Sequence, residues 1–465
     1  MPDLIDSETL QRVLGAALST GAEWAEVFAE DRRSTGAVLD DGKVEELTSG
    51  RDRGVGIRVV VGDSTGFAHT SDLSEAALLE TARIAAQAAR GAGEAGRTVQ
   101  LRAGESTLRP VGIYPDDIGK ARKVELLTLA DQAARTAGSG ITQVTARYSD
   151  SRRRIQVANS EGIVVGDDQV RTLLSVSCVA TGDTGMQTGR ESVGHTIGFE
   201  LFDRYDVEDL AATAAQRALT KLAARPAPSG QMTVVIGSGG GGVMFHEACG
   251  HGLEADLVEK GASVFAGRLG ELVASPLVTL VDDGTLGGEW GNFGIDDEGH
   301  VAQRNVLIED GVLVDYMWDG LRARKEGRTS SGNGRRQSYQ HLPMVRMTNT
   351  YLLGGSDSPE DIIADTDSGV YIAHLGGGQV NTATGDFVFG MTEAYLIEGG
   401  RITEPLREGN LIGNGPAVLG NIDAVGNDFA MGPPGTCGKD GQGVPVGDGV
   451  PTLRVHGLTI GGTAA

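Results

Sequence analysis

The stretch TVVIGSGGGGVMFHEACGHGLEAD, residues 233–256, contains a short apolar segment, a run of glycines and a helix-like segment. The apolar residues TVVIG are typical of a strand, and the four glycines interrupt the chain before a helix begins. That helix carries His246, Glu247 and His251. Imidazoles bind zinc well, and a carboxylate beside them can take a proton from a metal-bound water. The stretch therefore predicts a strand, a glycine turn and a helix that carries a metal site.

The spacing of the two histidines is unusual for a zinc helix. In an HExxH helix the histidines are four residues apart and share a face, whereas His246 and His251 are five apart. On a regular α-helix they would point about 140° apart, which is too divergent for one small ion. A π-bulge reduces this angle to about 50°. We therefore predict a bulged or prematurely ended helix at Gly250, because glycine tolerates such a distortion.

A catalytic zinc site usually has three protein ligands, so a third ligand is required. Cys437 is a good candidate because it lies in the glycine-rich segment GTCGKDGQGVPVG, where the backbone can approach a metal closely. The residues alone leave six alternatives open: Glu254, Asp256, His300, His341, His374 and His456.

The rest of the chain predicts an α+β protein of two domains. In residues 1–223, a helix, antiparallel strands and a helix occur twice, which indicates a duplicated unit; the first unit begins with a helix capped by Ser7 and ends with a helix over residues 74–90. Pro226 and Pro228 mark the boundary. Residues 229–465 alternate short strands with glycine turns, which predicts a mostly antiparallel barrel or sandwich around the histidine-bearing helix.

Charge and cysteine content exclude several classes of protein. The net charge of −23 argues against nucleic-acid binding, which depends on clustered Lys and Arg. Three distant cysteines do not suggest a disulfide framework. The start MPDLIDSETL lacks the pattern of a signal peptide, and no apolar run is long enough for a membrane span. We expect a soluble, cytoplasmic protein.

Several longer motifs resemble the TldD branch of the TldD/PmbA metallopeptidase family. The resemblance spans the C-terminal half in order and is less specific before it. It rests on the following segments: HEACGHGLEAD, DDEGHVAQRNVLIEDGVLVDYM, SGNGRRQSYQHLPMVRMTNTYL, GGGQVNTATGDFVFGMTEAYLIEGGRI, VGNDF and CGKDGQGVPVGDGVPTLRV.

The resemblance implies a zinc peptidase in which His246, His251 and Cys437 match the metal ligands and Glu247 matches the catalytic residue. It also implies a complex with a paralogous TldE/PmbA-type subunit that acts on unfolded peptides or peptide precursors. Iron or another divalent ion is an alternative to zinc. The alternative function is that of a catalytically silent subunit, which binds peptides, assembles with another protein or modulates it. Such a subunit needs none of these four residues.

Three further expectations concern the surroundings of the site. Cys249, between the two histidines, departs from the apolar residue expected there, and we expect it to pack as a small hydrophobic residue. His456, Arg335 and the backbone of residues 376–378 are candidate stabilisers of a developing oxyanion. The basic segment at residues 332–341 is a candidate site for a substrate carboxylate, although a solvated loop explains it equally well.

Overall fold

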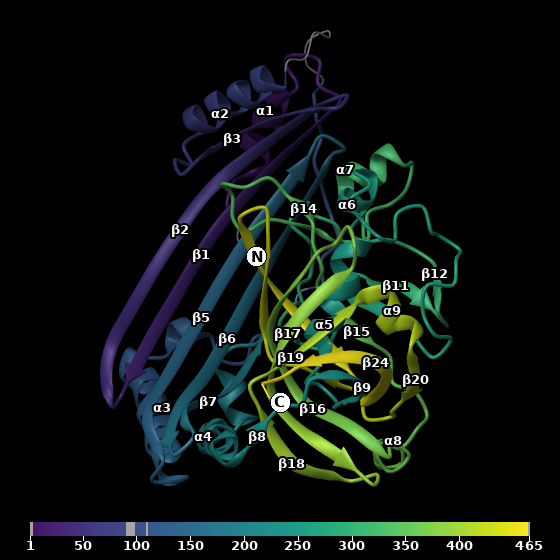
Figure 1. The fold of residues 1–465 in the computed structure, drawn as a ribbon. Helices are drawn as coiled ribbons and strands as arrows, with labels where there is room; N and C mark the ends of the chain where they lie inside the picture. Colours follow the sequence, from purple (N-terminus) through teal and green to yellow (C-terminus); the bar gives the residue numbers. More distant parts are fainter. Residues whose placement is uncertain (1–2, 90–97, 108–109, 464–465) are drawn as a thin grey trace.

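The computed structural model describes residues 3–89, 98–107 and 110–463 and shows an α+β fold (Figure 1). One large sheet has the strand order β3-β2-β1-β5-β6, with β7 and the short β4 paired to β6. Its elements are α1 (Ser7–Ala17), β1 (Trp24–Asp40), β2 (Lys43–Val61), β3 (Ser64–Thr70), α2 (Glu75–Ala88), β4 (Arg102–Ala103), η1 (Pro115–Asp117), α3 (Lys120–Thr136), β5 (Ile141–Asn159), β6 (Ile163–Gly182), β7 (Gly185–His195), η2 (Phe199–Asp203) and α4 (Val207–Ala223).

The order of these elements confirms the predicted duplication. A helix, three strands and a helix occur twice, and the antiparallel pairing of β1 with β5 joins the two units. Asp41 and Gly42 both have positive φ in the β1–β2 turn, as a tight Asp-Gly hairpin requires. The first helix is capped by Asp6 rather than Ser7, because the Asp6 carboxylate accepts the amide of Thr9. Residue 90, the last of the second predicted helix, lies outside the described residues.

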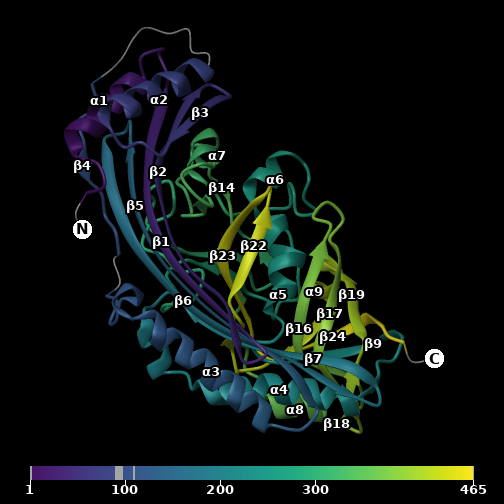
Figure 2. The ribbon, with the colours of Figure 1, turned by 90° about the vertical axis from the view of Figure 1, so that its left-hand side faces the viewer.

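Two helix pairs cover opposite ends of this sheet. Apolar residues of α1 and α2 share a core with β1 and β2, and those of α3 and α4 share another with β5 and β6. Figure 2 shows the long strands curving around the C-terminal half, with both helix pairs outside the curve. The sheet therefore has one face left for the C-terminal half.

The C-terminal half contains a closed barrel and a second sheet. The barrel has the order β16-β9-β24-β19-β17, and the pairing of β16 with β17 closes it. Its strands are β9 (Gly230–Ile236), β16 (Ser368–Val380), β17 (Asp386–Glu398), β19 (Gly409–Asn414) and β24 (Leu453–Gly461), with β8 (Arg225–Pro226), β18 (Ile402–Arg407) and β20 (Ile422–Val425) at its edges. Most pairs are antiparallel, as predicted, but β9 and β16 run parallel.

The second sheet carries the strands that reach the site. Its order is β12-β11-β10-β15-β23-β21, and β22 forms a hairpin with β23. These strands are β10 (Leu280–Asp283), β11 (Arg304–Glu309), β12 (Val312–Leu313), β15 (Asn349–Leu352), β21 (Ala430–Met431), β22 (Gly435–Lys439) and β23 (Gln442–Val450); β13 (Gly334–Arg335) pairs with β14 (Met344–Val345). The remaining helices are α5 (Gly242–Phe245), the turns η3 (His246–Gly250) and η4 (His251–Leu253), α6 (Ala255–Glu259), α7 (Gly320–Lys325), α8 (Pro359–Ala364) and α9 (Gly415–Gly420).

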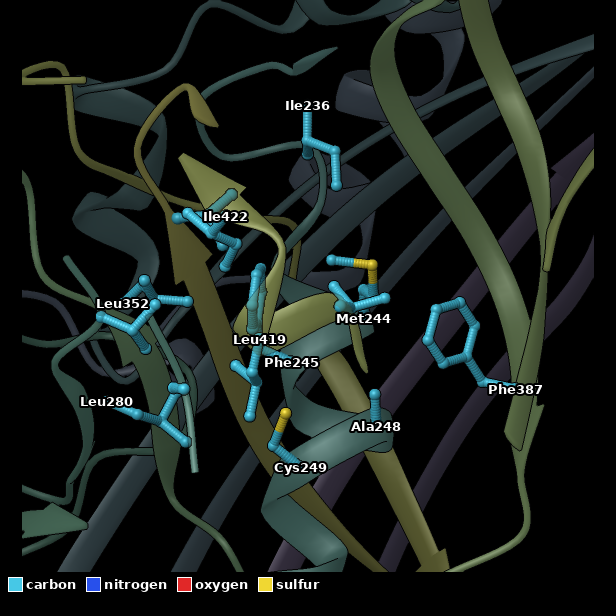
Figure 3. Packing of buried hydrophobic residues seen from close by; sticks show 14 of the residues in the cluster. Ile236, Met244, Phe245, Ala248, Cys249, Leu280, Leu352, Phe387, Leu419 and Ile422 are labelled. Atoms are coloured by element: carbon cyan, nitrogen blue, oxygen red, sulfur yellow. The ribbon is translucent and has the colours of Figure 1, made fainter. Parts of the chain in front are cut away.

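The helix that carries the histidines is buried between barrel and second sheet. Figure 3 shows Met244 and Ala248 on the side facing Phe387 of the barrel, and Phe245 and Cys249 on the side facing Leu280 and other second-sheet residues. These residues belong to one apolar cluster. The helix is thereby fixed from both sides.

Buried ion pairs join the two halves of the chain. Arg58 of β2 is 2% exposed and donates to Glu26, at 2.9 Å, and to Glu298 of the C-terminal half, at 2.6 Å. Arg153 of β5 pairs with Glu30 and with Asp297.

Among the described residues, no helix is both long and apolar enough to cross a bilayer.

Candidate metal centre

The glycine run lets β9 turn sharply into α5 beside two other strands. A Cβ on Gly240 would lie 1.6 Å from the carbonyl oxygen of Ala373 in β16, and one on Gly242 would lie 2.3 Å from Oδ1 of Asp448 in β23. Real side-chain carbons do not approach other atoms so closely. The glycines therefore allow the helix to begin against the backbones of both sheets.

The helix changes its winding at the histidines, as predicted. After α5, the chain forms the π-helical turn η3, in which the amide of His251 donates to the carbonyl of His246 across five residues. This turn brings the two side chains onto one side. A Cβ on Gly250 would lie 2.1 Å from Sδ of Met347, so the turn also needs glycine for space. The bulge at Gly250 is confirmed.

The structure brings His246, His251 and Cys437 together. One potential ligand atom from each lies within 4.8 Å of the others, and all three residues are buried. Sγ of Cys437 is 3.3 Å from Nε2 of His251, and the two imidazole rings stand nearly perpendicular, at 85°. No other group of three potential ligands is this close within residues 3–89, 98–107 and 110–463. The hairpin of β22 and β23 delivers the thiol to the helix.

Glu254 orients the second histidine. Its Oε2 lies 3.0 Å from Nδ1 of His251, which leaves Nε2 directed toward Cys437. Lys439 in turn donates to Glu254, at 2.9 Å, and to Asp256, at 2.7 Å. A carboxylate on the far nitrogen is how metal-ligating histidines are commonly fixed. Glu254 and Asp256, which were alternative ligands, therefore surround the cluster instead of joining it.

The electrostatics of the cluster favour a thiolate. Burial alone would raise the pKa of Cys437, but the neighbouring His246 and His251 lower it to about 4. Burial would lower the pKa of His251, but Glu254 and the thiolate raise it well above its usual value. Neither ring nitrogen of His246 has a hydrogen-bond partner among the described residues. Two imidazoles and a thiolate are suitable ligands for a tetrahedral zinc ion with a fourth position open. The unused ring nitrogens of His246 fit this role.

Glu247 lies at the edge of this cluster. Its Oε2 is 3.9 Å from Nε2 of His251, and its side chain is 24% exposed. Asp448 interacts electrostatically with both His246 and Glu247: burial and repulsion from Glu247 raise its pKa to about 6 against the attraction of His246. Sequence reasoning missed Asp448 and Lys439. The position of Lys439, two residues after Cys437, could have indicated it, since alternate residues of a strand share a face.

The remaining candidate ligands and oxyanion stabilisers have other neighbours. His300 lies beside Asp296, His341 bonds to Ser338, His374 to Arg217 and His456 to Asp423. Arg335 donates to the carbonyls of Met347 and Pro445. Gly376 and Gly377 line a cavity that Asp448 also lines. None of these residues joins the described metal cluster.

Cys249 packs as predicted. It is 1% exposed and belongs to the apolar cluster around the helix, on the side facing Leu280 and Leu419 (Figure 3). Burial raises the pKa of its thiol. A buried neutral thiol of this kind acts as a small apolar side chain.

Sequence models of one enzyme family match nearly the whole chain. Residues 25–89 match PmbA/TldA metallopeptidase domain 1, residues 113–222 the central domain and residues 229–462 the C-terminal domain. The metalloprotease TldD homolog of Haemophilus influenzae is 39% identical over 99% of this chain and 98% of the relative. A relative from Saccharolobus solfataricus, named zinc metalloprotease TldD homolog, is 27% identical over 95% of this chain and 97% of its own length.

A solved structure shares the fold. The crystal structure of TldE from Thermococcus kodakarensis superposes with a TM-score of 0.79 and covers 97% of this chain and 99% of that one. The sequence identity is 20%. The likeness therefore concerns the architecture of the whole chain.

Proposed function

The chain belongs to the PmbA/TldD family of metallopeptidases, and on that premise we propose that it hydrolyses unfolded peptides or peptide precursors with one zinc ion. We assign the ion to His246, His251 and Cys437. The observation that carries the assignment is the approach of one buried donor atom from each residue within 4.8 Å. Two nitrogens and one sulfur suit zinc better than calcium or magnesium, which prefer oxygen ligands. Iron or another transition metal is the alternative ion.

Glu247 is the proposed general base. A bound zinc ion would supply a Lewis acid and lower the pKa of a water ligand from 15.7 to about 7. The Glu247 carboxylate, beside the ligands and partly open to solvent, accepts a proton from the attacking water and returns it to the leaving amine. Glu254 holds the imidazole of His251 through Nδ1, so that Nε2 keeps its direction.

The ligand-bearing hairpin offers a site for an extended peptide. β22 pairs with β23 on one side, and no strand of the described residues pairs with its other side. An unfolded peptide that added a strand to a sheet edge would be recognised mainly through its backbone. This supports substrates without a strict sequence preference.

We propose a complex with a TldE/PmbA-type paralogue. Residues 43–53 of β2 are exposed and pair with β1 alone, because β3 pairs only with Val55–Val61. Exposed sheet edges readily pair with another chain. The shared fold of a solved TldE also supports such a partner.

We also propose a cytoplasmic location, which the three buried free cysteines support.

A Glu247→Ala protein tests the proposed role of the carboxylate. We expect peptide hydrolysis, measured with the paralogue present, to fall by about 10²- to 10⁴-fold, since this is the usual contribution of a general base. Metal content, measured by mass spectrometry, should stay at one ion per chain. Unchanged hydrolysis would contradict the assignment, and a silent binding subunit would show no hydrolysis before or after the change.

A further inference from the structure

A cavity rich in arginine lies between the large sheet and the ligand-bearing hairpin. Its volume is about 400 Å³, and we call it the arginine pocket. Figure 2 shows β22 and β23 on the concave side of the long strands. Five guanidinium groups line the pocket, and two carboxylates accompany them. The guanidinium groups belong to Arg32, Arg153, Arg171, Arg335 and Arg336.

Two of the arginines are matched by carboxylates. Arg153 pairs with Glu30 and with Asp297, which is one of the two acids of the pocket. Arg336 pairs with Glu26. The other acid, Asp150, is neutralised by Lys123 at 2.6 Å. The acids of the pocket therefore leave three arginines without a dedicated counter-ion.

These three arginines have no carboxylate among their hydrogen-bond partners in the described part of the chain. Arg171 donates to the carbonyl of Trp290, to that of Asn292 and to the Gln169 amide oxygen. Arg335 donates to two backbone carbonyls. Arg32 lies opposite Arg153 in the β1–β5 register, so its side chain shares the pocket face. Backbone carbonyls orient the guanidinium groups of Arg171 and Arg335 without neutralising them.

Burial and the crowding of cations lower the pKa of two of these arginines. Burial lowers the pKa of Arg171 to about 9, and repulsion from Arg335, Arg153 and Arg32 contributes to this. Burial and repulsion from Arg346 lower the pKa of Arg335 to about 10, although Asp297 partly opposes this. A buried cation without an anion is unfavourable. An anion in the pocket would remove this penalty and could accept paired hydrogen bonds from the guanidinium groups.

The pocket adjoins the hairpin that carries Cys437, although none of the proposed metal ligands lines it. Its wall includes Thr436, which precedes Cys437, and Val444, which pairs with Cys437 across the hairpin. A molecule bound in the pocket therefore contacts the same two strands that deliver the thiol. A peptide held along this hairpin could place one end in the pocket while another part lies near the ligands.

We propose that Arg32, Arg171 and Arg335 bind a carboxylate of the peptide substrate, either its C-terminus or an acidic side chain. The proposal rests on the proposed peptidase function. It adds a charge preference to backbone recognition that otherwise depends little on sequence. The basic segment suspected from the sequence contributes Arg335, but the strands of the large sheet supply the other two arginines.

Calorimetric titration of the full-length chain tests the proposal through binding, independently of turnover. The Glu247→Gln protein is titrated with one peptide in three forms: a free C-terminal carboxylate without acidic residues, its C-terminal amide, and the amide with one internal glutamate. Inorganic phosphate is titrated separately and as a competitor. We expect at least one carboxylate form to bind about 10-fold more tightly than the neutral amide, as charge-assisted hydrogen bonds typically provide. Comparison of the two carboxylate forms shows whether the pocket binds the C-terminal carboxylate or an acidic side chain.

Arg32→Gln is the decisive variant because Arg32 is exposed at the pocket and its side chain makes no hydrogen bond within the described part of the chain. It should abolish the preference for the carboxylate form. Arg33→Gln removes the same charge from the next residue, which points to the other face and pairs with Asp116, and should keep the preference.

Three results would overturn the proposal: equal binding of all three peptide forms, an unchanged preference in Arg32→Gln, or tight binding of phosphate without any peptide preference. Intact binding preferences in a chain that hydrolyses nothing would reject the peptidase proposal but keep the pocket. Hydrolysis without a carboxylate preference would keep the peptidase proposal but reject the proposed role of the arginine pocket.

Discussion

At the scale of single residues, Glu254 controls which nitrogen of His251 faces the cluster. It accepts from Nδ1 at 3.0 Å. A Glu254→Gln change should weaken metal binding by about 10- to 100-fold, the usual effect of losing a partner that orients a ligand. Competition with a calibrated chelator measures this affinity. Asp423→Asn, which changes the carboxylate beside the exposed His456, is the matched control, and an equal effect of both changes would contradict the role of Glu254.

Cys249 provides a second residue-scale prediction. Because it packs among apolar side chains, Cys249→Ala should lower the free energy of unfolding by about 1 kcal/mol, as small cavities in cores do. The metal content and the hydrolysis rate should not change. Chemical denaturation, metal analysis and a peptide hydrolysis assay measure these three properties. A loss of bound metal would show that Cys249 is a ligand and would revise the site.

The sequence predicted the residues of the site better than their surroundings. The five-residue spacing of His246 and His251 already required a distorted helix, and the structure has one. The spacing could not identify the third donor, because the partner of a helix residue comes from a distant strand. Family resemblance pointed to Cys437, and the geometry brings it to the cluster. The metal-ligand assignment itself is still a prediction.

At the scale of elements, the π-helical turn depends on the space beside Gly250. Because a Cβ there would lie 2.1 Å from Sδ of Met347, Gly250→Ala should cost about 1–3 kcal/mol of stability, as overpacking does. It should also weaken metal binding by displacing His251. Gly438→Ala, beside Cys437 and with nothing within 4 Å of its Cβ, is the control.

A second substitution can show that the clash is the cause. Adding Met347→Ala to the Gly250→Ala protein should restore metal affinity, because it removes the obstructing sulfur. Thermal unfolding and chelator competition measure both properties. A Gly250→Ala protein with unchanged affinity would contradict the proposed dependence of the ligands on this turn.

Local sequence patterns predicted the helices, strands and turns well, whereas they could not predict which distant strands pair. The Asp-Gly turn after β1 followed from local chemistry. The cap of α1 shifted by one residue because Asp6 and Ser7 are both good capping residues. The parallel pairs β9–β16 and β15–β23 connect segments far apart in the chain. No local pattern specifies such partners.

At the scale of the whole molecule, a buried ion network holds the two halves together. Burial alone would raise the pKa of Glu298, but the attraction of Arg58 and His300 lowers it to about 2. Because the folded pKa lies below the ordinary value, the ionised Glu298 stabilises the fold above about pH 4.5. This stability is lost as the pH falls toward the folded pKa. The network joins residues on both sides of the predicted boundary between residues 223 and 229, and that boundary stays a prediction.

Glu298→Gln tests this account. At neutral pH it should cost about 3–5 kcal/mol, since it leaves a buried arginine partly unpaired. The difference from the unsubstituted protein should shrink as the pH falls from about 5 toward 2. Denaturation at several pH values measures it. Glu161→Gln, in the exposed pair with Arg324, should cost no more than about 1 kcal/mol. A pH-independent difference would refute the linkage.

The most direct test of the central claim is X-ray absorption at the zinc edge of the metal-loaded protein. We predict one sulfur at about 2.3 Å and two imidazole nitrogens at about 2.0–2.1 Å from a single ion. The sulfur contribution should disappear in Cys437→Ser, and the imidazole contribution should halve in His246→Ala. A first shell without sulfur, or one that neither substitution changes, would contradict the assignment of the ion to His246, His251 and Cys437.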